Sequence, residues 1–78
     1  MNSYKMVKFL NMDKALLAKN GKTFLASFSN VPLSGPEVLV FPCDAYGNVT
    51  DWLEVDGGRG YQNLQEFLTE VVLNTNRQ

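Results

Sequence analysis

The segment Val38–Val55, with the sequence VLVFPCDAYGNVTDWLEV, contains two runs of strand-forming residues on either side of a turn signal. Residues 38–41 and 49–55 are rich in β-branched and aromatic side chains, which favour strands. The intervening residues DAYGN suit a type I turn, in which Gly47 adopts a positive φ and Asp44 bonds back to the turn backbone. The segment therefore predicts an antiparallel hairpin.

This turn also predicts the pairing of the two strands. It places Cys43 opposite Val49, Phe41 opposite Asp51, Val40 opposite Trp52 and Leu39 opposite Leu53. Because strand side chains alternate between faces, one face is expected to carry Leu39, Cys43, Val49, Leu53 and Val55 and to meet a helix. The other face is expected to carry Val38, Val40, Pro42 and Trp52, with Thr50 and Glu54 among them. A one-residue bulge would instead turn Trp52 inward and Asp51 outward, and both arrangements remain open.

A second hairpin is predicted upstream, where Asn20-Gly21 separates residues 15–19 from residues 22–28. Asn-Gly is the preferred pair for a type I′ turn, because both residues tolerate positive φ. The alternative makes residues 12–19 a short helix that ends at a glycine cap. Residues 4–10 are predicted to form a further strand.

The C-terminal part of the chain predicts a helix. Its apolar residues recur at helical spacing, namely Leu64, Phe67, Leu68, Val71 and Val72. Asn63 is the expected N-cap, with Glu66 completing a capping box. The 78 residues therefore predict a single α+β domain, an antiparallel sheet of four to five strands with one C-terminal amphipathic helix packed on one face.

The composition excludes several kinds of chemistry. The chain has no His and one Cys, Cys43, so it lacks an imidazole base and the Cys and His ligands of a zinc site. We therefore predict a non-catalytic protein with no cofactor and no metal. Asp51 with Glu54 or Asp56 is the remaining acid–base alternative, and no pocket is implied around these side chains. With a single thiol, no secretory signal and no apolar run long enough to cross a bilayer, we expect a cytoplasmic protein that does not enter a membrane.

One helix can cover only one face of a sheet, so the predicted opposite face is the candidate for partner binding. Its candidate residues are Val38, Val40, Trp52 and Glu54. Trp is enriched at binding hot spots because it buries a large area at little entropic cost. The expected partner is another protein or a second copy of the chain; the alternative is that loops of the same chain cover Trp52.

Charge is unevenly distributed along the sequence. Five lysines lie in the first 36 residues, Lys5, Lys8, Lys14, Lys19 and Lys22, and most acidic residues follow them. A weak nucleic-acid-binding protein using these lysines is the alternative function, although they lack interleaved aromatic residues, which makes nucleic acid an unlikely partner. Gly58, Arg59 and Gly60 form a glycine-rich turn before the helix and are a candidate anion site.

The segment 38–55 resembles a pattern in small uncharacterised proteins of bacteriophages and prophages. In these, an apolar strand, an Asp-x-x-Gly turn and a Val-x-Asp-Trp-x-Glu strand recur. The resemblance implies an accessory protein of a mobile element that acts by binding a host protein, and it implies no activity. The predicted function is a small protein-binding module that contacts a host protein or self-associates.

Overall fold

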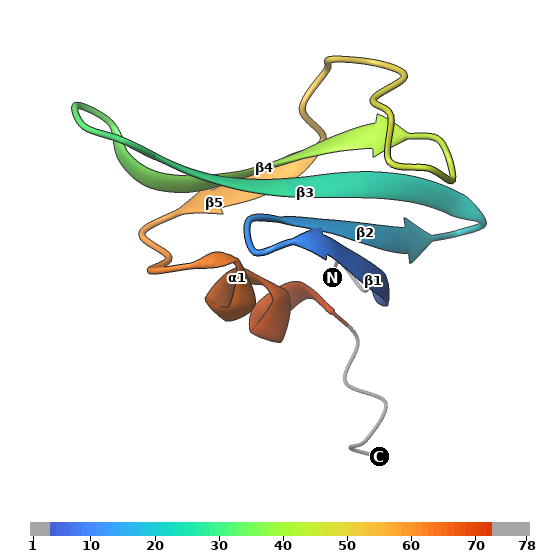
Figure 1. Ribbon diagram of the computed structural model, residues 1–78, viewed down its shortest axis with the longest axis horizontal. Coiled ribbons are helices and arrows are strands. Elements are labelled where there is room, and N and C mark those ends of the chain that lie inside the picture. Colours follow the sequence, from blue (N-terminus) through green and yellow to red (C-terminus); the bar gives the residue numbers. More distant parts are fainter. Residues whose placement is uncertain (1–3, 73–78) are drawn as a thin grey trace.

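The computed structural model describes residues 4–72, which form a five-stranded antiparallel sheet and one short C-terminal helix (Figure 1). The elements are β1 (Lys5–Asn11), β2 (Lys14–Lys19), β3 (Lys22–Val31), β4 (Gly35–Cys43), β5 (Asp56–Arg59) and α1 (Leu64–Val71). Each strand pairs with its neighbour in the chain, in the order β1-β2-β3-β4-β5. The predicted sheet of four to five strands followed by a helix is confirmed.

The β2–β3 hairpin forms at the predicted turn. Asn20 and Gly21 have φ angles of 54° and 77°, as a type I′ turn requires. Lys19 pairs with Lys22 directly beside the turn, and pairing continues to Lys14 and Ser27. Residues 14–19 are therefore a strand, and the alternative of a helix ending at a glycine cap is wrong.

The helix begins at its predicted cap. The Asn63 side chain accepts a hydrogen bond from the Glu66 backbone N–H at 3.0 Å. The Glu66 carboxylate in turn accepts from the Gln62 N–H at 2.9 Å. One backbone donor of the first turn and one just before the cap are thus satisfied, and the acidic side chain lies where the helix dipole favours it.

Two clusters of buried residues lie on opposite faces of the sheet. The first joins the helix to the strands and contains Tyr4, Ala15, Leu17, Ala26, Val38, Val40, Leu64, Phe67 and Leu68. The second contains Leu16, Leu25 and Cys43, with Val49 packed against them. We call these sides the helix face and the loop face, because residues 44–55 lie on the side of the sheet away from α1 (Figure 1).

The predicted assignment of the two faces is wrong. Val38 and Val40 are fully buried in the cluster that contains the helix residues. Cys43 and Val49, which were expected to meet the helix, lie on the loop face. Strand β4 is apolar at almost every position, so its sequence alone does not indicate which face the helix covers.

The predicted second strand of this hairpin is also wrong beyond its first residue. Cys43 pairs with Val49 as expected, but as an isolated bridge. The chain then continues as a loop and returns as β5, where Asp56, and not Trp52, pairs with Val40. The glycines of β5 permit this return, because a side chain at Gly57 would collide with the Val38 carbonyl. Neither Trp52 nor Asp51 faces the helix. The predicted place of Trp52 away from the helix is therefore confirmed, whereas the predicted inward place of Asp51 and the bulge alternative are wrong.

Substitution of Val40 tests the corrected arrangement. Val40→Ala removes buried methyl groups from the helix-face cluster, so we expect it to lower the free energy of unfolding by about 2 kcal/mol. Leu53→Ala should change it by less than about 0.5 kcal/mol, because an exposed side chain contributes little. Urea denaturation of the two variants measures both values. Equal small effects would contradict the assignment of Val40 to the core.

Candidate partner-binding surface

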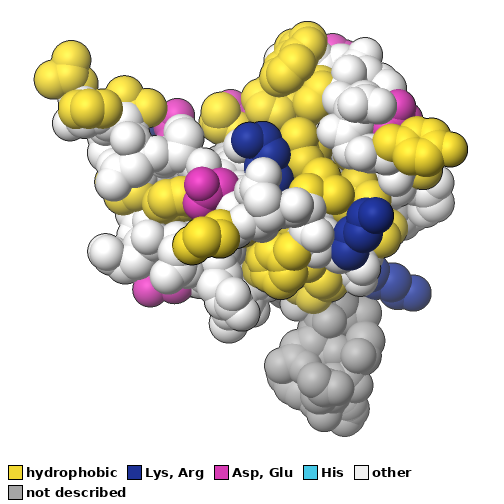
Figure 2. Space-filling view, in the orientation of Figure 1, with side chains coloured by type: hydrophobic (Ala, Val, Ile, Leu, Met, Phe, Trp, Pro, Cys, Tyr) yellow, Lys and Arg dark blue, Asp and Glu magenta, His cyan; other side chains and the backbone are white. Residues whose placement is uncertain are grey.

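The loop 44–55 exposes large apolar side chains. Tyr46 is 84% exposed, Trp52 75%, Leu53 67% and Val55 44%. We call these four residues the loop surface. Figure 2 shows how hydrophobic side chains gather across the visible side of the molecule, with lysine or arginine side chains between them. A surface of this kind on a small protein is typical of an interaction site.

Asp44 fixes the first half of this loop. Its carboxylate accepts the Asn48 and Tyr46 backbone N–H groups, both at 2.9 Å, and the Asn48 side-chain amide at 3.3 Å. The hydrogen bond from the Asn48 backbone is the main cause that lowers the pKa of Asp44. Gly47 has a φ of 90° and donates to the Asp44 carbonyl at 3.0 Å. The predicted roles of Asp44 and Gly47 in the turn are confirmed.

The second half of the loop is tied to β4 by hydrogen bonds and ring packing. Thr50 N–H donates to the Pro42 carbonyl at 3.0 Å, and Val55 N–H donates to the Val40 carbonyl at 2.9 Å. The Trp52 ring meets the Phe41 ring edge-on, with centroids 5.2 Å apart. Trp52 therefore rests on β4 on the loop face while most of its surface stays exposed.

The structure separates the four residues predicted to bind a partner. Trp52 and Glu54 lie in the exposed loop, whereas Val38 and Val40 are buried against the helix and are not accessible to a partner. The sequence prediction missed Tyr46, Leu53 and Val55. A signal for Tyr46 was present, because the third position of an Asp-x-x-Gly turn belongs to a loop, and loops run over the protein surface.

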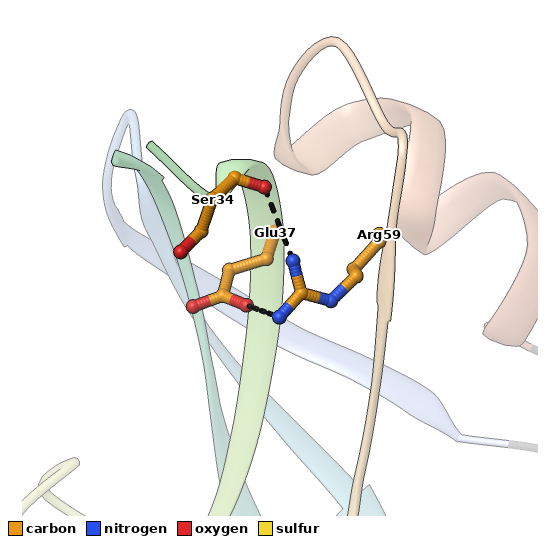
Figure 3. A network of polar contacts seen from close by, with 3 residues as sticks. All are labelled: Ser34, Glu37 and Arg59. Atoms are coloured by element: carbon orange, nitrogen blue, oxygen red, sulfur yellow. Dashed lines mark hydrogen bonds and ion pairs between the residues drawn. The ribbon is translucent and has the colours of Figure 1, made fainter. Parts of the chain in front are cut away.

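The residues of the candidate anion site are bonded to the protein itself. The Arg59 guanidinium lies 3.4 Å from a Glu37 carboxylate oxygen and donates to the Ser34 carbonyl at 3.1 Å (Figure 3). Gly60 N–H donates to the Pro36 carbonyl at 3.3 Å. A side chain at Gly58 would collide with the ring of Tyr61. These contacts hold β5 to the start of β4, and anion binding stays a prediction.

Tyr4 connects the segment before β1 to β5 and to the end of α1 on the helix face. It is 1% exposed, its hydroxyl donates to Asp56 Oδ2 at 2.6 Å, and its backbone N–H donates to the Val71 carbonyl at 2.9 Å. Its ring meets Phe24 edge-on and lies 4.9 Å from Lys19 Nζ. Burial, followed by the hydrogen bond to Asp56, raises the pKa of Tyr4 well above its usual value.

A cleft of about 940 Å³ opens beside Tyr4, between the β2–β3 turn and the loop 44–55. Lys19, Lys22, Phe24, Pro42 and Asp56 are among its lining residues. Cys43 also lines it, and burial is the main cause that raises the pKa of this thiol. The carboxylates considered for acid–base chemistry are not equivalent, because Asp56 accepts from Tyr4 whereas Asp51 accepts the Leu53 N–H in the exposed loop.

Neither a family model, a curated protein nor a solved structure matches this chain. The resemblance to bacteriophage and prophage proteins therefore stays a prediction based on the segment 38–55. Within residues 4–72, no helix is long and apolar enough to span a bilayer.

Removing the Asp44 carboxylate should loosen the loop without unfolding the sheet. In Asp44→Ala the Tyr46 and Asn48 amides lose their acceptor, so we expect faster hydrogen exchange at both. Amides of β3 should keep their protection, and they serve as the internal control. Unchanged exchange at Asn48 would show that the loop is held by other contacts.

The Tyr4 hydroxyl should make stability depend on alkaline pH. The raised pKa means that the folded protein retains a proton that the unfolded chain loses above about pH 10, so stability is fully present below that pH and falls as pH rises. Between pH 9 and pH 11 the loss of stability contributed by Tyr4 is about 1.4 kcal/mol in total. Tyr4→Phe should remove this part of the slope, measured by urea denaturation between pH 9 and pH 11. An identical slope in the variant would contradict this assignment.

Proposed function

We propose that this protein is a non-catalytic protein-binding module that contacts its partner through the loop surface. The observation that carries the proposal is the exposure of Trp52 and Leu53, 75% and 67%, on a loop whose backbone is hydrogen-bonded at its start, middle and end. A flexible loop could turn such side chains inward. In this loop the bonds of Asp44, Thr50 and Val55 hold the backbone on both sides of Trp52 and Leu53.

The energetic case rests on two terms. An aromatic side chain buries about 150–250 Å² in an interface, and apolar burial contributes roughly 25 cal/mol per Å². Trp52 and Tyr46 are the large aromatic residues of the loop surface and are therefore its expected hot spots. The second term is entropic, because a loop already held in one conformation loses little freedom on binding.

The charge around the loop surface indicates the chemistry of the partner. Asp51 and Glu54 flank Trp52 and Leu53 in sequence and are exposed. A partner should therefore offer an apolar pocket with basic side chains at its rim, because such charges speed association and exclude wrong partners.

The strand register gives less support to the nucleic-acid alternative. Lys5, Lys8 and Lys14 pair with loop-face residues, whereas Lys19 and Lys22 are on the same side as Leu17 and Phe24, the helix face. The five lysines therefore do not form one continuous basic surface. A nucleic-acid footprint normally requires such a surface.

Trp52→Ala tests the proposed function against a matched control. Leu33, which is 99% exposed in the turn between β3 and β4, is the control position, because Leu33→Ala also removes an exposed apolar side chain. In cross-linking and pull-down from cells that make the protein, Trp52→Ala should weaken capture of a partner at least about tenfold, and Leu33→Ala should not. Trp52 is the single Trp of the chain, so its fluorescence should shift to shorter wavelength on binding. Equal capture by both variants would contradict the proposal.

A further inference from the structure

The lysines of the loop face are gathered on strands β1 and β2. Lys5 pairs with Ala18, and Lys8 pairs with Leu16, a member of the loop-face cluster. Lys14 is two residues before Leu16 and so projects from the same face. All three lysines are exposed, and Asp13 in the β1–β2 turn offsets one of them. This half of the loop face is net positive.

The other half of the loop face is net negative. Asp51 and Glu54 lie exposed in the loop, and Glu54 together with Glu37, Leu39 and Arg59 lines a small hollow beside β4 and β5. Arg59 is paired with Glu37 and so offsets that carboxylate alone. Positive and negative halves thus lie side by side on one face, with Trp52 and Phe41 on the negative side.

These opposite charges do not neutralise each other inside one molecule. Within residues 4–72, none of Lys5, Lys8 and Lys14 forms an ion pair with Asp51 or Glu54. The first part of the loop reaches strand β1, because a side chain at Gly47 would lie 2.8 Å from Leu10 Cδ1. The charges therefore remain available to a second molecule.

We propose, building on the proposed function, that the partner of the loop surface is a second copy of this chain. A face with one positive and one negative half is complementary to itself when two copies are related by a two-fold axis that lies in the plane of the interface, along the border between the halves. Lys5, Lys8 and Lys14 of one copy then meet Asp51 and Glu54 of the other, and the same contact occurs twice. Strand β1 offers the exposed apolar side chain of Leu10 and the basic side chains of Lys5 and Lys8, which match the apolar contact and basic rim inferred above.

The apolar contacts and the available area fit such a dimer. Leu10 is 37% exposed on the basic half, and its counterparts Trp52 and Leu53 lie on the acidic half. A lysine against the Trp52 ring adds a cation–π contact. A stable interface takes about 800 Å² from each partner, a modest share of the 5201 Å² that the molecule exposes.

Charge reversal tests this dimer directly. Sedimentation equilibrium should show a dimer of the wild-type chain that weakens about tenfold or more between low and high salt. Lys8→Glu with Lys14→Glu makes the loop face acidic throughout, and Asp51→Lys with Glu54→Lys makes it basic throughout. Each double variant alone should be monomeric, and an equimolar mixture of the two should form a heterodimer. Lys22→Glu, on the helix face, is the matched control and should dimerise like the wild type.

The equimolar mixture of the two double variants distinguishes loss of the interface from loss of the fold. Two folded variants would form the heterodimer, whereas an unfolded variant would not. A wild-type chain that stays monomeric at high concentration and low salt would overturn the dimer, as would homodimers of either double variant. If the chain is monomeric but captures another protein in a Trp52-dependent manner, the second copy is excluded while the proposed function stands. If the dimer forms and is unaffected by Trp52→Ala, both are overturned.

Discussion

A single short helix can cover only one face of a five-stranded sheet, and the rest of this structure follows from that limit. Val38 and Val40 of β4 pack with the helix, so the residues between and beyond them, among them Leu39 and Cys43, project to the opposite side. That side carries apolar residues too, and the loop 44–55 covers them in part. Val49 packs against Leu16, Leu25 and Cys43, and Trp52 lies on Phe41. The loop therefore completes the core and forms the exposed surface at the same time.

Features that depend on neighbouring residues could be predicted from the sequence. The Asn20-Gly21 turn, the Asp44 and Gly47 turn and the Asn63 cap each depend on the φ preference or side-chain acceptor of one or two residues. These turns and this cap are stabilised by interactions between residues close in sequence, so they can be recognised from a single sequence. The antiparallel meander follows once these turns are placed, because short turns join neighbouring antiparallel strands.

Features that depend on which distant groups meet could not be predicted. Val40 is close in sequence to Trp52 through the turn, but it pairs with Asp56. The residues around the turn do not distinguish the predicted Val40–Trp52 pair from the observed Val40–Asp56 pair, because β4 is hydrogen-bonded along its edge in both. The difference is that the observed pairing lets Val49 and Trp52 cover the loop face, while the glycines of β5 allow close approach to β4. Trp52 was correctly expected outside the helix cluster, but Val38 and Val40 were placed with it because β4 has apolar residues on both faces.

The exposure of Trp52 follows from the size of the domain. A chain of 78 residues has few apolar side chains to assign to two faces, and the helix uses Leu64, Phe67 and Leu68 on one of them. On the loop face the Trp52 ring lies against Phe41 and remains 75% exposed. The Asp44 hydrogen bonds hold the start of the loop, and this exposed part of Trp52 is the apolar surface that the proposed partner would bury.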